Sequence, residues 1–349
     1  MEEVVVQHLF NGARVAMIEA ARELGKLSSK QRHKDKRGVI KPLILMLHSQ
    51  YYEAIEAALF ALLCLTLGSE RNKIRVVKSG AIPDLLSLLQ CQNEALIELT
   101  LAAMFILYSC TANKLAIASS GTIQHLIQFL NGGVNNMSSI GMKPKLDAIA
   151  TLHNLSTCDQ IIPSIASSSL LSSILQLIHN SEKSSELVEK TMGLLENIAS
   201  SSENALCEIA STHGVICAMV ETKEDGSPQC KEHAVEILLL ICQSNKEIYR
   251  RLILREGVMP GLLKLSVRGT RRAKDMAREL LLLLRHCSSY SLRNEQPKVE
   301  LIEAIMQEID TRENMDTTTL IEMTEKSNDR TYKKNRKIYS IKVFSLTFV

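Results

Sequence analysis

The sequence predicts an all-α solenoid built from about seven copies of one helical unit. Two observations support this: a turn residue recurs about every 43 residues, and an apolar helical frame recurs with it. A unit of this size cannot cover its own apolar faces, so neighbouring units are expected to stack. The turn residues, at spacings of 42, 41, 48, 45 and 43, are Gly38, Gly80, Gly121, Ser169, Gly214 and Gly257.

Residues 71–109 show the unit most clearly. A short amphipathic segment at 74–77 runs into Gly80, which can supply the backbone angles of a sharp turn between helices. Pro83 then opens a second helix with leucines at helical spacing, since proline near a helix start removes an amide that lacks an intrahelical partner. After a polar break, a third helix is expected from about residue 96 to residue 108.

The third helices align independently on the frame Ala-x-x-x-Leu-x-x-Leu. A helical repeat of 40 to 47 residues is typical of armadillo and HEAT proteins, and the three-part unit with a glycine turn favours armadillo. The frame begins at Ala20, Ala58, Ala148, Ala234 and Ala277, with variants that begin at Thr100 and Thr191.

The repeat sets the expected boundaries. An insertion at 131–143 and a loop at 222–229 are predicted inside units four and six. After the array, the amphipathic stretch 298–310 is expected to cap its exposed end, and the polar composition of 311–349 predicts a disordered tail. The units are predicted at 3–30, 31–68, 71–110, 112–157, 159–200, 203–243 and 245–287.

Composition excludes several function classes. Only 4% of residues are aromatic and none is Trp, which disfavours a small-molecule pocket. The net charge of +3 is carried by 311–349, so the balanced remainder gives nucleic-acid binding no electrostatic support. The longest near-apolar stretch, 57–67, is too short to span a membrane, and the acidic start does not resemble a signal peptide.

Nine cysteines without a CxxC pair are expected to be reduced and mostly buried, which places the protein in the cytoplasm, the nucleus or both. No metalloprotease HExxH, serine-hydrolase elbow or phosphate-binding glycine loop occurs. We therefore expect no enzyme activity, no catalytic or metal-ligating residues and no cofactor. The expected partner is another protein.

Three strings carry a family resemblance: NKIRVVKSGAIPDLLSLL at 72–89, CKEHAVEILLLIC at 230–242, and REGVMPGLLKLSVRGTRRAKDMARELLLLLR at 255–285. They resemble armadillo-repeat proteins, in particular the repeat region of plant U-box ubiquitin ligases. The resemblance implies a right-handed armadillo superhelix that recognises a protein partner. In that family the U-box, which recruits the conjugating enzyme, precedes the repeats, and the sequence before residue 4 leaves no room for one. The resemblance therefore predicts a recognition scaffold or adaptor without the ligase module, and the alternative is a degenerate ligase component that recruits a conjugating enzyme elsewhere.

The candidate site lies on the third helices, at the position between the two leucines of the frame. In armadillo proteins that bind extended peptides, an asparagine here pairs with the ligand backbone, because its amide both donates and accepts. The interpretation that each amide is satisfied by neighbours on its own helix stays open. The predicted groove residues are Asn154 and Asn197, His153 and Glu196 beside them, Ile106 at the same position of unit three, and Glu236 one turn earlier in unit six.

Overall fold

The computed structural model describes residues 2–30, 38–131, 141–166 and 168–285. Within these ranges the chain forms helices and turns without any strand, so the all-α prediction is confirmed. The predicted capping segment 298–310 and the tail 311–349 lie outside the described residues. The helices form two compact groups: an N-terminal unit of residues 1–181 and 186–208, and a C-terminal unit of residues 182–185 and 209 onward.

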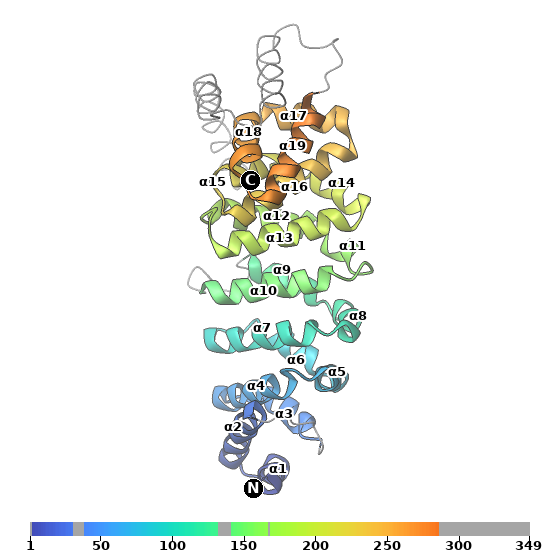
Figure 1. Ribbon diagram of the computed structural model, residues 1–349. Helices are drawn as coiled ribbons and strands as arrows, with labels where there is room; N and C mark the ends of the chain where they lie inside the picture. Colours follow the sequence, from blue (N-terminus) through green and yellow to red (C-terminus); the bar gives the residue numbers. More distant parts are fainter. Residues whose placement is uncertain (1, 31–37, 132–140, 167, 286–349) are drawn as a thin grey trace. The chain divides into compact units, whose positions relative to one another are not determined.

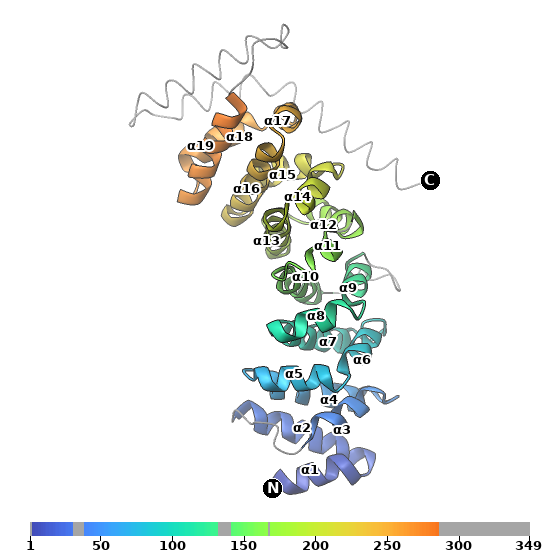
Figure 2. The same cartoon turned by 90° about the vertical axis from the view of Figure 1, so that its right-hand side faces the viewer.

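The helices follow the three-part pattern (Figures 1 and 2). First helices are α5 (Glu70–Lys78), α8 (Lys114–Ala118, after the 3-10 turn η1, Thr111–Asn113), α11 (Ile162–Ile165), α14 (Glu203–Ser211) and α17 (Lys246–Arg255). Second helices are α1 (Glu2–Asn11), α3 (Ile40–Leu47), α6 (Ala81–Leu88), α9 (Thr122–Leu130), α12 (Ser168–Asn180), α15 (Val215–Asp225) and α18 (Met259–Arg268). Third helices are α2 (Arg14–Lys30), α4 (Tyr52–Thr66), α7 (Glu94–Tyr108), α10 (Met142–Ser156), α13 (Glu186–Ser201), α16 (Pro228–Ser244) and α19 (Arg271–Arg285).

The predicted glycine turns are confirmed. All five glycines have a positive φ, between 72° and 88°, a backbone conformation that residues with a Cβ rarely adopt. The prediction for Ser169 was wrong, because this residue lies inside α12. In unit five α11 ends at Ile165 and α12 already begins at Ser168.

In the N-terminal unit the third helices stack side by side, with α2 on α4, α4 on α7, α7 on α10 and α10 on α13. The second helices α3, α6 and α9 lie behind them in Figure 1, and Figure 2 shows the two layers from the side. Frame leucines fill the space between the layers: Leu152 and Leu155 on α10 are fully buried. In the C-terminal unit α16 packs against α15, α17 and α19, and α18 packs against α19.

A cation seven residues before the turn glycine ties the first helix of a unit to the end of its third helix. Lys73 Nζ donates to Ser109 Oγ at 2.8 Å, Lys114 Nζ donates to Thr157 Oγ1, and Arg250 Nε donates to the Leu284 carbonyl at 2.8 Å. The carboxyl end of a helix carries partial negative charge, so a cation there is favourable. These recurring contacts close units three, four and seven.

The predicted loop at 222–229 was wrong except at Gly226 and Ser227. Helix α15 continues to Asp225 and α16 begins at Pro228, which leaves only Gly226 and Ser227 between them. The side chain of Lys223 is fully buried, and its Nζ donates to the Val258 carbonyl at 2.8 Å. Gly261 on α18 leaves the space for that amine, because a Cβ there would overlap Nζ.

Candidate functional site

The half-exposed side of the five stacked third helices of the N-terminal unit forms one continuous face, called here the third-helix face. Its residues follow the first frame residue by two, five and six positions, and each helix contributes one residue to each row. On the four helices from α4 to α13, the residues at these three positions are Phe60, Leu63 and Cys64 on α4; Ala102, Phe105 and Ile106 on α7; Ala150, His153 and Asn154 on α10; and Gly193, Glu196 and Asn197 on α13.

Asn197 is held against the neighbouring helix. Its Nδ2 donates to Ser156 Oγ at 2.6 Å, and that hydroxyl donates in turn to the His153 carbonyl at 2.8 Å. The contact joins α13 to the last turn of α10. One amide hydrogen of Asn197 is therefore used inside the fold. Its side-chain carbonyl oxygen and second amide hydrogen can still bind a ligand.

Asn154 differs from Asn197. It is half-buried at the equivalent position of α10, and no described residue makes a hydrogen bond to its side-chain amide. Its backbone carbonyl accepts from Thr157 Oγ1 at 3.0 Å, which fixes the end of the helix but leaves the amide group unused. Both the carbonyl oxygen and the amine of this side chain are therefore without a hydrogen-bond partner among the described residues.

The structure brings five of the six predicted site residues onto the third-helix face. His153 and Glu196 are half-buried immediately before the two asparagines, and Ile106 is half-buried on α7, the next helix of the stack. These placements agree with the frame-based register. Whether a partner contacts them remains a prediction.

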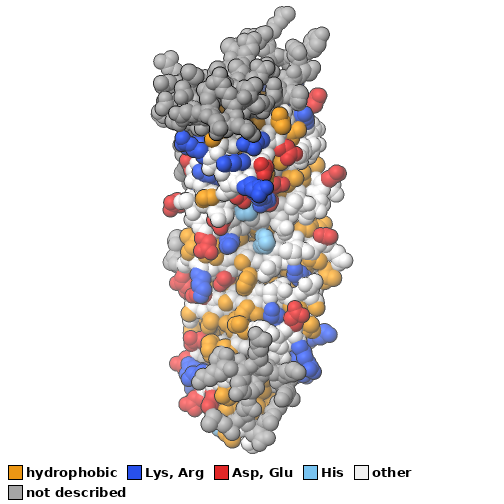
Figure 3. All heavy atoms as spheres, viewed as in Figure 1, with side chains coloured by type: hydrophobic (Ala, Val, Ile, Leu, Met, Phe, Trp, Pro, Cys, Tyr) orange, Lys and Arg blue, Asp and Glu red, His pale blue; other side chains and the backbone are white. Residues whose placement is uncertain are grey.

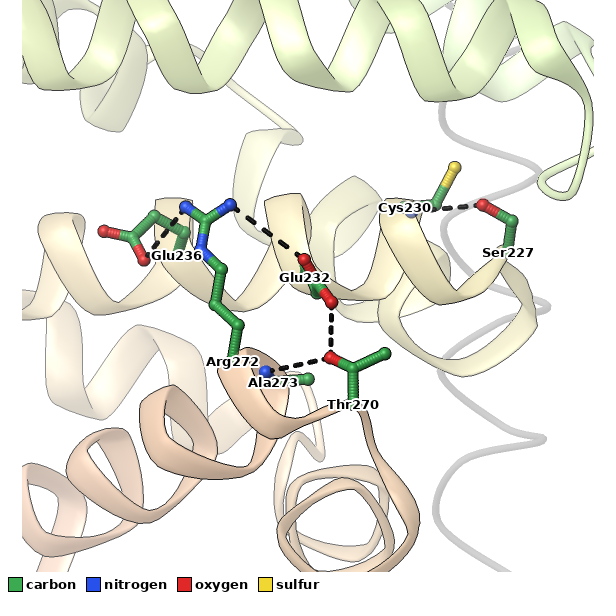
Figure 4. A network of polar contacts seen from close by, with 7 residues as sticks. All are labelled: Ser227, Cys230, Glu232, Glu236, Thr270, Arg272 and Ala273. Atoms are coloured by element: carbon green, nitrogen blue, oxygen red, sulfur yellow. Dashed lines mark hydrogen bonds and ion pairs between the residues drawn. The ribbon is translucent and has the colours of Figure 1, made fainter.

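The sixth predicted residue, Glu236, belongs to the C-terminal unit and takes part in a polar network between α16 and α19 (Figure 4). Its Oε2 lies 3.7 Å from one guanidinium nitrogen of Arg272. The other terminal guanidinium nitrogen of Arg272 lies 4.0 Å from Glu232 Oε2. Thr270 Oγ1 also donates to Glu232. The carboxylate of Glu236 therefore has a structural role in joining these two third helices.

Of the apolar part of the third-helix face, the sequence prediction named only Ile106 as a site residue. Phe60 is 40% exposed, and Leu63 on the same helix and Phe105 on α7 are half-buried. Figure 3 shows this side of the N-terminal unit, where charged side chains lie mainly toward the edges and hydrophobic and uncharged atoms occupy the middle. Helical spacing alone could not single out these residues, because core positions of the same helices are equally apolar.

A cluster of three acidic residues, Glu94, Glu98 and Asp147, borders the third-helix face between α7 and α10. Lys143 pairs with Glu98 at 2.5 Å, and the Gly141 amide donates to Glu94 Oε1 at 2.9 Å. Burial raises the pKa of Asp147, the Lys143 ammonium lowers it, and the nearby Glu98 raises it. One carboxylate oxygen of Asp147 is buried, and no described group makes a hydrogen bond to it.

Replacing Asp147 by asparagine is therefore expected to stabilise the protein slightly at pH 7. A raised pKa means that the folded state holds this proton to higher pH than the unfolded state, so the charged form destabilises the fold at neutral pH. The gain is below about 1 kcal/mol because water screens a half-buried group. Urea unfolding should show the gain shrinking as the pH falls through the carboxyl range, and a loss of stability at pH 7 would contradict this account.

The described residues contain no group of three His, Cys, Asp or Glu side chains placed to hold a metal ion. Across the same ranges no single helix is long and apolar enough to cross a membrane, although α7 and the following segment 111–118 pass together by length and composition, with a bend of 103° between them.

Comparison with solved structures identifies the fold. An engineered protein matches 90% of this chain and 75% of its own with a TM-score of 0.69 and 19% identity. A designed armadillo repeat protein matches 70% of this chain and 99% of its own with a TM-score of 0.59 and 19% identity. The chain has the armadillo-repeat fold. No family model matches the sequence.

The sequence relatives of this armadillo array are plant proteins. U-box domain-containing protein 45 of Arabidopsis thaliana is 29% identical over 253 residues, which cover 71% of this chain and 31% of the relative. U-box domain-containing protein 17 of the same plant is 26% identical over 288 residues, which cover 70% of this chain and 38% of the relative. The chain thus spans less than two fifths of the length of either relative.

Proposed function

We propose that the chain is a non-enzymatic protein-binding scaffold whose N-terminal unit holds an extended segment of a partner protein on the third-helix face. The observation that supports this most is the pair of asparagines at equivalent positions of adjacent helices, one of them with an unused amide. Exposed Phe60 on α4 and half-buried apolar residues on α4 and α7 continue the same rows. Such a face offers both backbone hydrogen bonds and apolar contacts.

The spacing suits an extended chain. Packed helices lie about 8–10 Å apart, and an extended chain advances about 3.3 Å per residue, so adjacent helices meet backbone groups two to three residues apart. Asn154 and Asn197 would then each bind one backbone amide of the partner. His153 and Glu196 would contact the side chains between those points.

A site-directed cross-linking experiment tests where the partner binds. A photo-reactive phenylalanine analogue replaces Ile106 on the third-helix face, and a control carries it at Leu115, which is 51% exposed on α8. In an extract of the source cells, we expect a protein adduct from position 106 that position 115 does not give. The same adduct from both positions, or none from 106, would contradict the proposed face.

The finer proposal is that this scaffold recognises substrates in a ubiquitin pathway. Its support is the likeness to proteins named for a U-box domain. The alternative is a degenerate ligase component that promotes transfer through a recruited conjugating enzyme. Purified protein mixed with activating enzyme, conjugating enzymes and ubiquitin should build no chains, whereas robust autoubiquitination would favour the ligase component.

A further inference from the structure

The last third helix, α19, departs from the others at one position. The residue directly after the first frame residue is apolar and fully buried in all six preceding third helices: Ala21, Leu59, Leu101, Ile149, Met192 and Val235. In α19 the equivalent residue is Arg278, and it is exposed. Within each unit this position is buried where another third helix follows, and α19, which no described third helix follows, presents a cation there.

Arg278 is part of a basic stripe. Arg271, Lys274 and Arg278 follow each other at helical spacing, so they share one side of α19, on which Asp275 is the one exposed acidic residue between them. Arg271 is exposed and Lys274 is half-buried. Residues 245–285 as a whole contain eleven Lys and Arg against four Asp and Glu, although the charge over 1–310 is balanced. The positive charge is thus concentrated in the last unit.

This stripe does not suit another armadillo repeat. A further third helix would have to bury Arg278 against an apolar frame, and a buried charge without a partner costs several kcal/mol. An acidic helix fits instead, because its carboxylates would neutralise the stripe at the surface. A nearby segment of the sequence can supply this acidic helix.

The sequence that follows carries the opposite charge. Residues 298–310 contain four acidic residues and one lysine. Glu300, Glu303 and Asp310 share one side of a helix, at successive spacings of three and seven, and the first of these spacings equals that between Arg271 and Lys274. The apolar residues of the segment, including Ile302 and Met306, form the adjacent stripe.

The connection is long enough. Helix α19 has 15 residues, so it is about 22 Å long. The twelve residues from 286 to 297 can span up to about 40 Å, which allows the segment to run back along α19. Leu282, 48% exposed one turn beyond Arg278, offers apolar contact beside the stripe.

We propose that residues 298–310 dock as an acidic amphipathic helix on the basic stripe Arg271, Lys274 and Arg278, and so close the carboxyl end of the array within the same chain. The docked segment would replace the missing next repeat by charge pairing.

Hydrogen–deuterium exchange of the full chain, read by mass spectrometry, tests this proposal. Peptides covering 298–310 should exchange slowly in the wild type, and the Lys274→Glu, Arg278→Glu variant should exchange about tenfold faster as two exposed ion pairs become repulsive. Adding Glu300→Lys and Glu303→Lys to that variant should restore protection. The control Lys264→Glu, Arg268→Glu changes two exposed cations of α18 in the same unit and should leave 298–310 protected.

Several outcomes would overturn the proposal. The segment would not dock if it exchanged as an unstructured peptide in the wild type. Equal loss of protection in the α18 control, or no rescue by the double charge reversal, would exclude pairing with the α19 stripe. Protection that rises with protein concentration would assign the docking to a second copy.

Discussion

Replacing Leu155 by alanine is expected to lower the free energy of unfolding by about 2–5 kcal/mol. Leu155 is fully buried on α10, which packs between α7 and α13 in the middle of the N-terminal unit. The truncation removes apolar contacts and leaves a cavity that stacked helices cannot easily close. Because each repeat buries its faces only on its neighbours, several repeats should lose structure together.

Urea titration followed by circular dichroism measures this loss. The matched control is Leu115→Ala on α8, where the side chain is 51% exposed, so its change should stay within about 0.5 kcal/mol. A Leu155→Ala loss as small as that of the control would mean that the frame does not form the core of the array.

The second large effect concerns Lys223 and depends on pH. Burial lowers the pKa of this amine from 10.5 to about 8, although the neighbouring Glu224 raises it. Between these two values the unfolded state holds a proton that the folded state has released, so stability rises with pH in that window. Below pH 8 both states are protonated, and the full cost of the buried charge is present.

The Lys223→Met variant isolates this contribution. We expect the stability of the wild type relative to the variant to rise by up to about 3 kcal/mol between pH 8 and pH 10.5, following 1.4 kcal/mol per pKa unit. Both proteins contain all the other lysines. Taking the difference between their unfolding free energies at each pH therefore removes the contribution of those lysines. A difference that is constant over this range would contradict a buried amine with a lowered pKa.

The repeat period was readable in the sequence because it depends on local chemistry. Five glycines placed the turns correctly, since only glycine adopts these positive φ values at little cost. At Ser169 the same alignment failed, because a residue with a Cβ does not require a turn at that place. The sequence therefore predicted a turn correctly only where the backbone has a positive φ, which favours glycine.

Contacts between distant residues could not be predicted in this way. The stretch TKED looked like a polar loop, yet Lys223 is buried because Gly261, 38 residues later, leaves space for its amine. Asn197 was placed on the correct face, but its bond to Ser156 depends on how two helices meet. The basic stripe on α19 was hidden by a charge balance taken over the whole array.

The binding proposal is tested most directly by the Asn154→Ala, Asn197→Ala variant. After circular dichroism has shown that it is folded, calorimetry compares its affinity for the cross-linked partner segment with that of the control Asn180→Ala, Asn204→Ala, whose asparagines are exposed outside the third-helix face. Loss of hydrogen bonds to a desolvated strand, about 1–3 kcal/mol at each site, predicts that affinity falls about a hundredfold or more in the first variant and is unchanged in the control. Equal affinities for the two variants would contradict binding through the asparagine pair.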